Sequence, residues 1–272
     1  MCFLGKLSQR GSRFGIILPM LLFGNRFKLC EAFGIPVYVD ISFAILLLLF
    51  VGSGASFTEG VTEALLLALS IVLHEFGHSL TARLFGYRTT DITISLLGGC
   101  ASLISLPRRA WQEFLTALAG PLVSFALAAI GFFTLFFFPI ENHWLRYALF
   151  YLMWLNLMLG GFNLLPGFPL DGGRIFRSVL RAFLSRPKAT FVAMWVGRVF
   201  AILLGLSGLH AIVYGGGWGF IRILIAWMIW TEGYREYQLA LMESSWDYQD
   251  FRARVSPPPY GGEGDDCDVT RN

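Results

Sequence analysis

Long apolar runs separated by short polar segments dominate the hydrophobic pattern of this chain. An α-helix needs about 20 apolar residues to cross a lipid bilayer, and six runs reach or approach that length. They lie at about residues 36–52, 62–86, 112–138, 145–165, 190–214 and 218–233. The first run is short, so Asp40 is expected near the membrane interface. The pattern predicts an all-α polytopic membrane protein with about six transmembrane helices.

A different pattern, with a period of two, occurs between the second and third apolar runs. Along residues 88–106, β-branched and polar residues alternate, and Gly98 and Gly99 interrupt the alternation. This predicts a small membrane-associated β-hairpin between helices 2 and 3, although an amphipathic surface loop would have a similar pattern. A hairpin at membrane depth is tolerated only where protein buries it or where it lines an aqueous cavity.

The two ends of the chain contain no run long enough to span. Residues 14–23 are apolar but short and are interrupted by Pro19. They resemble the core of a signal peptide, but no clear cleavage site follows. We therefore expect residues 1–34 to be a cytoplasmic or interfacial segment and residues 35–240 to be the six-span domain. Residues 241–272 are predicted to be a cytoplasmic, largely disordered tail, because the sequence from Ser256 onward is rich in proline, glycine and acidic residues.

Composition and charge agree with this assignment. Hydrophobic residues make up 56% of the 272 residues and charged residues only 14%, whereas an average soluble domain has about 25% charged residues. Most of the 21 lysines and arginines fall in inner segments if both termini are inside. The positive-inside rule thus predicts a multi-pass protein of the cell (inner) membrane with cytoplasmic N- and C-termini. The net charge of +3 is small, and we expect no nucleic-acid partner. The four cysteines are scattered and suggest neither a disulfide framework nor a thiolate metal site.

The second apolar run contains a His-Glu-x-x-His pattern. His74 and His78 are four residues apart, so they lie on one face of an α-helix and can reach the same metal ion. Glu75 lies beside them and is placed to take a proton from water next to the metal. Because ionisable side chains are costly inside a membrane, these three residues are candidates for function.

A hydrolytic metal site of this kind needs a third protein ligand and one position open to water. His143 and His210 are expected near the outer side and are poor candidates. Asp171 is a better one, because Pro166 and Pro169 interrupt the helix just before it. From spacing alone, Asp171 is equally suited to cap the helix that follows.

These motifs resemble the site-2 protease family of intramembrane zinc metalloproteases (peptidase family M50). The resemblance covers roughly residues 35–190 and rests on His-Glu-Phe-Gly-His at 74–78 and on Asn-x-x-Pro-x-x-Pro-x-Asp-Gly at 163–172. Ala-Gly-Pro at 119–121 and Gly-Gly-Cys-Ala at 98–101 are similar to further motifs of the family. The combination of the first two motifs is highly specific.

The resemblance implies one Zn²⁺ per chain, bound by His74, His78 and Asp171, with Glu75 as the general base. It also implies that Asn163 lies near the substrate, where its amide could donate to the oxyanion. The implied activity is regulated intramembrane proteolysis, in which zinc-activated water hydrolyses peptide bonds of a transmembrane protein substrate within the lipid bilayer. The active site should open toward the cytoplasm. The sequence leaves the substrate and any regulatory membrane partner unidentified.

One residue departs from the family pattern, and two other functions stay open. Family members often carry Asn three residues after the Gly-Pro of the third-span motif, where this chain has Ser124. This weakens the match of the third span, and we expect it to leave the metal site unaffected. The alternatives are a zinc-dependent membrane hydrolase of a non-peptide substrate and a non-catalytic membrane scaffold. The segment from Asn163 to Asp171 argues against the first, and Glu75 argues against the second, because a scaffold needs no such base.

Overall fold

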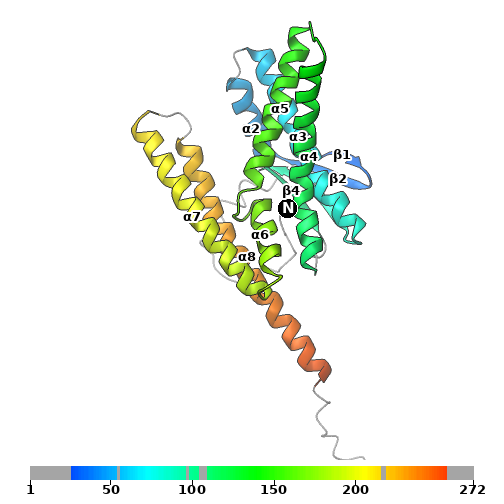
Figure 1. Ribbon diagram of the computed structural model, residues 1–272, viewed down its shortest axis with the longest axis vertical. Coiled ribbons are helices and arrows are strands. Elements are labelled where there is room, and N and C mark those ends of the chain that lie inside the picture. Colours follow the sequence, from blue (N-terminus) through cyan, green and yellow to red (C-terminus); the bar gives the residue numbers. More distant parts are fainter. Residues whose placement is uncertain (1–25, 54–55, 96–97, 104–108, 216–218, 256–272) are drawn as a thin grey trace, which may run out of the picture.

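The computed structural model describes residues 26–53, 56–95, 98–103, 109–215 and 219–255 of the chain. Figure 1 shows helices and strands in the order β1 (Arg26–Ala32), β2 (Ile35–Asp40), α2 (Ile41–Ser53), α3 (Phe57–Leu84), β3 (Thr89–Ser95), β4 (Gly98–Leu103), α4 (Ala110–Phe137), α5 (His143–Asn163), α6 (Asp171–Leu180), α7 (Arg186–Val213) and α8 (Gly219–Val255). The apolar segment at 14–23 and the tail from Ser256 onward lie outside the described residues.

Four of the described helices, α3, α4, α5 and α7, are long and apolar enough to cross a membrane. Three of them have 28 residues and α5 has 21, which at 1.5 Å per residue gives lengths of about 42 and 32 Å. The predicted runs at 62–86, 112–138, 145–165 and 190–214 are thereby confirmed as long apolar helices.

The first and last predicted spans differ from the expected pattern. α2 has only 13 residues, or about 20 Å, because residues 35–40 at the start of the predicted span form a strand. α8 has 37 residues, so it extends well beyond the predicted span at 218–233. It ends at Val255, and residues 241–255, which the sequence assigned to a largely disordered tail, are helical.

The strands form a single four-stranded sheet with the order β1-β2-β3-β4. Within the region of the predicted hairpin, β3 and β4 pair antiparallel. However, β1 and β2 form a second antiparallel pair, and β2 joins β3 in parallel. The expectation of a helix from residue 36 was therefore wrong over residues 36–40. The strand β1, within the expected cytoplasmic or interfacial segment, was not predicted. The strand at 35–40 alternates apolar and other residues, but the long apolar run that directly follows hides this short pattern.

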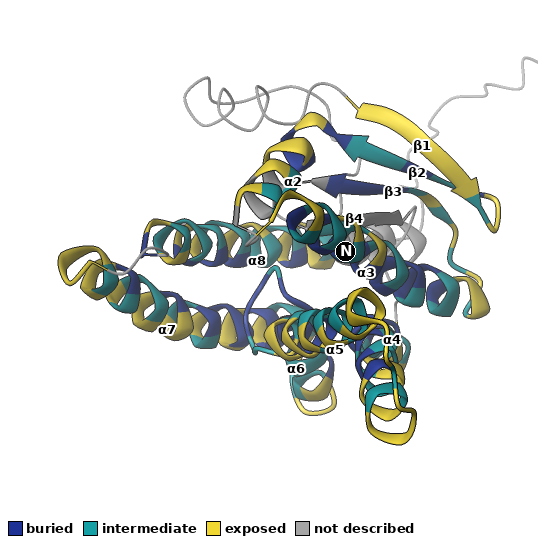
Figure 2. Cartoon of the chain, turned by 90° about the horizontal axis from the view of Figure 1, so that it is seen from above, coloured by how far each residue is buried: buried dark blue, intermediate teal, exposed yellow. Residues whose placement is uncertain are grey.

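An apolar core fixes the sheet against the helix that carries His74 and His78. Ile35 and Val37 of β2 and Ile92 and Ile94 of β3 are buried together with side chains of α2 and α3. In Figure 2, β1 is exposed along its length, whereas β2 and β3 contain buried residues. The core includes Phe76, so its packing reaches into the His-Glu-x-x-His segment.

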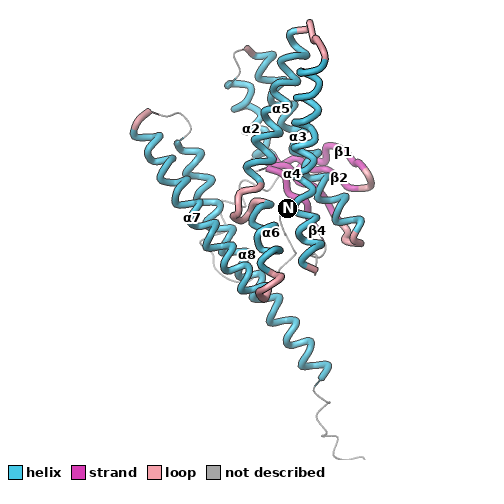
Figure 3. The backbone as a smooth tube through the Cα atoms, in the orientation of Figure 1, coloured by secondary structure: helices cyan, strands magenta, loops and turns pink. Residues whose placement is uncertain are grey.

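The last two long helices, α7 and α8, pack mainly on each other and stand apart from α3, α4 and α5 in Figure 1. They meet the rest of the protein through α6 and through the loop that joins α5 to α6, drawn in pink in Figure 3. Gly167 in this loop and Gly197 of α7 approach so closely that a Cβ on either would lie 3.1 Å from the other's Cα. Small residues at this crossing permit the close approach.

Replacing Ile92 with alanine tests whether the sheet is a stable part of the core. Ile92 is fully buried, and Ile→Ala substitutions in cores lower the free energy of unfolding by about 2–5 kcal/mol. We expect Ile92→Ala to lower the thermal unfolding midpoint of the detergent-purified protein clearly. Phe27→Ala on the exposed strand β1, where the side chain is 62% exposed, should change stability by no more than about 0.5 kcal/mol. Equal effects of the two substitutions would contradict this packing.

Candidate metal centre

The His-Glu-x-x-His segment lies in the second half of α3, where all its residues are helical. His74, Glu75 and His78 are buried, with exposures of 3%, 4% and 0%. The Nε2 atoms of the two imidazoles lie 3.2 Å apart. The helical spacing therefore directs both rings to one point, as the sequence predicted.

Asp171 reaches the same point from a different helix. It is the first residue of α6, and its Oδ2 lies 3.1 Å from Nε2 of His74 and 3.1 Å from Nε2 of His78. The residue at the N-cap position is Leu170, so Asp171 does not take the capping role that its spacing also allowed. Burial tends to raise the pKa of the Asp171 carboxyl, but the adjacent His78 and the hydrogen bonds to both histidines hold that pKa far below its usual range. The group is therefore a charged carboxylate.

The three atoms form a nearly equilateral triangle that suits a metal ion. The ligand atoms of a tetrahedral ion with bonds of about 2.0–2.1 Å are about 3.3–3.4 Å apart, close to the 3.1–3.2 Å observed. Among the described residues, His74, His78 and Asp171 form one group whose side chains are close enough together to hold a metal ion.

Two contacts from α4 support this interpretation. Nδ1 of His78 lies 2.7 Å from the carbonyl oxygen of Thr116. A carbonyl oxygen only accepts, so Nδ1 of His78 carries a proton. When a metal replaces the proton on Nε2, the Nε2 lone pair points into the triangle. Gly120 borders the same point, because a Cβ there would lie 2.7 Å from Nε2 of His74 and closer still to Nε2 of His78. The space left by the glycine is available to an ion.

Ser124 also touches the site, contrary to the expectation from sequence. Its Oγ lies 2.9 Å from Nδ1 of His74, and the residue is fully buried. A hydroxyl can accept a hydrogen bond from Nδ1–H and so orient the ring, as partners of metal-bound histidines usually do. Thr116, Gly120 and Ser124 are spaced by four residues and lie on one face of α4. That row of small and polar residues in an apolar helix is the signal that would have found them.

The two predicted catalytic residues lie in different surroundings. Glu75 contacts the sheet, since a Cβ at Gly99 of β4 would lie 2.8 Å from its Oε1 and closer still to its Cγ. Asn163 is the last residue of α5, and its amide donates to the carbonyl oxygen of Leu159 in the same helix at 2.9 Å. The fold thus brings together the three candidate ligands with Glu75 on the same helix, whereas the Asn163 amide is directed at its own helix.

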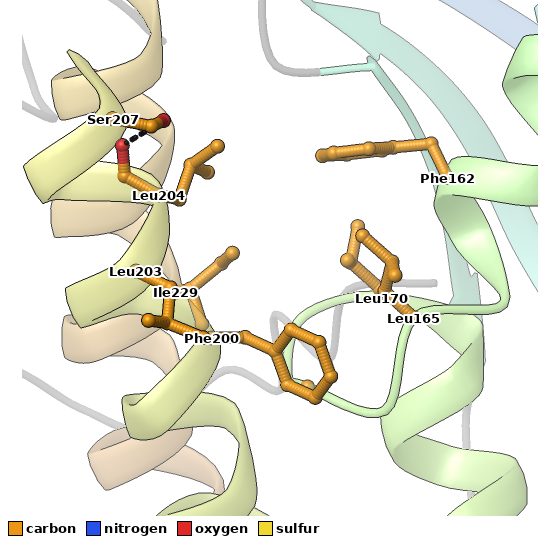
Figure 4. Close-up of a pocket in the computed structure, with 9 residues that line it drawn as sticks. Phe162, Leu165, Leu170, Phe200, Leu203, Leu204, Ser207 and Ile229 are labelled. Carbon is orange, nitrogen blue, oxygen red and sulfur yellow. Dashed lines mark hydrogen bonds between the residues drawn. The ribbon is translucent and has the colours of Figure 1, made fainter.

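An apolar cavity of about 270 Å³ lies next to the residue that precedes Asp171. Phe162, Leu165 and Leu170 face Phe200 and Ile229 of the α7–α8 pair across it (Figure 4). Ser207 lines it too, and its hydroxyl donates to the carbonyl oxygen of Leu204 in the same helix. This cavity is not the metal centre, but it shares the loop that leads into Asp171.

A family comparison identifies the kind of protein to which this site belongs. The model of peptidase family M50 matches residues 62–206, more than half of the chain, and this range includes every residue of the candidate centre. The chain belongs to peptidase family M50. Together with its four long apolar helices, this membership supports a multi-pass membrane protein.

Individual relatives agree with the family assignment. Zinc metalloprotease MJ0392 of Methanocaldococcus jannaschii is 34% identical over 220 residues, which cover 80% of this chain and 62% of that protein. Putative zinc metalloprotease Rip3 of Mycobacterium tuberculosis is 34% identical over 181 residues, covering 65% of this chain and 46% of that protein. The solved structure of the site-2 protease from M. jannaschii matches with a TM-score of 0.60 and 32% identity, covering 78% of this chain and 95% of that one. The chain spans less than two thirds of the length of these two curated relatives.

Removal of the Ser124 hydroxyl tests whether α4 orients a metal ligand. Loss of such a partner typically weakens metal affinity by about 10–100-fold. We expect Ser124→Ala to raise the dissociation constant for Co²⁺, measured by its visible absorption, by about tenfold or more. Ser207→Ala is the matched control, since that hydroxyl donates to the carbonyl oxygen of Leu204 in its own helix, away from the metal centre, and it should leave the constant unchanged. An unchanged constant for Ser124→Ala would exclude an orienting role.

Proposed function

We propose that this chain is an intramembrane zinc metalloprotease that hydrolyses peptide bonds in the membrane-spanning segments of other proteins. The observation that carries the proposal is the triangle of His74 Nε2, His78 Nε2 and Asp171 Oδ2, built on a helix long enough to cross a membrane and adjacent to Glu75. One of the relatives above is named a zinc metalloprotease and the other a putative zinc metalloprotease, which supports zinc as the ion. We propose one Zn²⁺ per chain, because the described residues contain one such group.

Two histidines and one carboxylate would hold the ion and leave a fourth position open. A bound zinc ion supplies Lewis acidity, which acidifies water near neutral pH and polarises a peptide carbonyl. The protein contributes the orientation of the rings through Thr116 and Ser124. The charged carboxylate of Asp171 offsets part of the positive charge that a dication brings into a buried site.

Glu75 is the proposed general base. It precedes the ring of His78 by less than one helical turn and is 4% exposed, so it is shielded from bulk water. Its carboxylate would accept a proton from the attacking water and deliver it to the leaving amine. The contact with Gly99 places the strand β4 directly beside this group, and a larger residue at that position would displace the base.

The sheet suggests how a substrate could be presented. A transmembrane helix hides its peptide bonds in hydrogen bonds, so it must unwind before hydrolysis. β4 is the last strand of the described sheet, and an outer strand has backbone groups that can pair with an added strand. Because Gly99 of β4 contacts Glu75, we propose that an unwound substrate segment pairs along β4 and lies next to the base. Asn163 would donate to the oxyanion once its amide turns away from Leu159.

The orientation in the membrane is part of the proposal. The arginine-rich helix α6 begins at the metal centre, and arginines concentrate in cytoplasmic segments. We therefore propose that the centre opens to the cytoplasm, with both termini on that side and the protein in the cell membrane. The substrate is a transmembrane protein, and cleaved fragments would leave on the cytoplasmic side.

Replacing Glu75 by glutamine tests the proposed chemistry. The amide cannot accept the proton of water, but it preserves the size of the side chain. We therefore expect Glu75→Gln to retain zinc, measured by elemental analysis, and to lose cleavage of a single-pass substrate in proteoliposomes by about 10²-fold or more. Glu63→Gln is the matched control: Glu63 is buried on the same helix and accepts from Tyr147 outside the metal centre. Full activity of Glu75→Gln would exclude Glu75 as the base.

A comparison of membranes containing active protein or Glu75→Gln tests the substrate class. A single-pass protein should accumulate uncut with the inactive variant, as judged by quantitative proteomics. A changed lipid profile with no uncut protein would favour a non-peptide substrate. Purified protein without zinc, and no loss of zinc on His78→Ala, would favour a scaffold instead.

A further inference from the structure

The charged face of α6 has no part in the chemistry proposed above, although it begins at a candidate ligand. Arg174, Arg177 and Arg181 follow Asp171 at spacings that place the three within about 60° of one another around the helix. They meet Glu113 of α4 and Glu236 of α8. The side chain of Arg177 is only 1% exposed and that of Glu113 only 6%. Charges so deeply buried are expensive unless they are paired.

Arg177 is the centre of this group. Its Nε donates to Oε1 of Glu113 at 2.8 Å, and its Nη1 donates to Oε2 of Glu236 at 2.9 Å. The guanidinium also lies over the ring of Phe168, 4.9 Å from its centroid. Phe168 is fully buried and lies three residues before Asp171. Arg177 thus joins α4, α8 and the loop that leads into the candidate ligand.

The remaining oxygens of the two carboxylates are also used. Arg181 donates to Oε2 of Glu113 at 2.7 Å, and Arg174 donates to Oε1 of Glu236 at 3.1 Å. Burial tends to raise the pKa of Glu236, but Arg174 and Arg177 lower it to about 2. Burial tends to lower the pKa of Arg177, but Glu113 and Glu236 raise it above its usual value. The bridge therefore stays charged across the physiological pH range.

We propose that Arg177, bridged to Glu113 and Glu236, is a positioning residue that sets the rotation of α6 and so presents Asp171 to the metal. α6 has ten residues, and a helix of that length is not stable alone. Arg177 lies six residues after Asp171, about 9 Å along the axis. Fixing its guanidinium on two neighbouring helices fixes the direction in which the first turn points.

The proposal depends most on the ion pair between Arg177 of α6 and Glu113 of α4. Glu113 lies on the same helix as Thr116 and Ser124, whose oxygen atoms contact the two histidines. The Arg177–Glu113 bridge therefore links the helix that carries the third ligand, α6, to the helix that orients the first two, α4. Metal–ligand distances tolerate errors of only about 0.2 Å, so a small rotation of α6 would weaken binding.

Glycine packing could hold α6 without the arginine. A Cβ on Gly172 would overlap the carbonyl oxygens of Leu164 and Leu165, and one on Gly173 would lie 2.7 Å from the carbonyl carbon of Gly167. These backbone contacts position the first turn near the loop. The experiment must therefore distinguish the effect of the arginine bridge from the effect of the glycine contacts.

The test measures the zinc affinity of the full-length protein in detergent by competition with a chelator, together with thermal unfolding in excess chelator. It rests on the proposed zinc site. Arg177→Lys keeps the charge but loses the forked geometry, and Glu113→Gln weakens the connection to α4. We expect each to raise the zinc dissociation constant by about tenfold or more. Arg235→Met is the control, because it removes an exposed ion pair with Glu232 within α8 and should leave the constant within about twofold.

Three results would overturn the inference. Unchanged zinc affinity in Arg177→Lys and Glu113→Gln, even with lower thermal stability, would mean that the glycine contacts suffice. Equal weakening by Arg235→Met would mean that loss of any ion pair near the bridge has the same effect. If Arg177→Lys does not purify folded, Glu113→Gln decides the question by the same measurement. A wild-type protein that binds no zinc would instead overturn the metal centre itself, and the bridge with it.

Discussion

The close approach of two imidazole nitrogens and one carboxylate oxygen, at 3.1–3.2 Å, is the interaction on which the rest of this structure depends. Three such groups are costly to bury unless a shared cation and defined hydrogen bonds stabilise them. The surrounding fold provides those conditions. Thr116 and Ser124 contact the rings, and Gly120 leaves room beside them.

α4 helps to position all three candidate ligands. It is long and apolar enough to cross a membrane, while one face carries the small and polar residues that meet α3. Its first turn carries Glu113, which binds the arginines of α6. The same helix therefore contacts the histidines directly and, through Arg177, supports the helix of the third ligand. This arrangement allows Asp171, on a short helix after an irregular loop, to meet two residues more than ninety positions earlier in the chain.

The four-stranded sheet packs against α3. Its core of isoleucine and valine side chains extends to Phe76, next to the proposed base. Gly99 brings the backbone of β4 against Glu75. The proposed base thus lies between the helix α3 and a strand at the edge of the described sheet, where an extended peptide could pair.

Much of this could be predicted from the sequence, because it depends on local spacing. The four long apolar helices follow from the length of the apolar runs. The antiparallel strands β3 and β4 and the shared face of His74 and His78 follow from periodicity within one segment. The motif around Asp171 identified the third candidate ligand through family resemblance, where spacing alone left a capping role equally open. Only the tertiary structure decided the parallel pairing of β2 with β3, the contact of Ser124 with His74 and the bridge from Arg177 to Glu113. Each of these joins segments separated by about fifty residues or more, and no local pattern of hydrophobic and polar positions specifies which distant partners will meet.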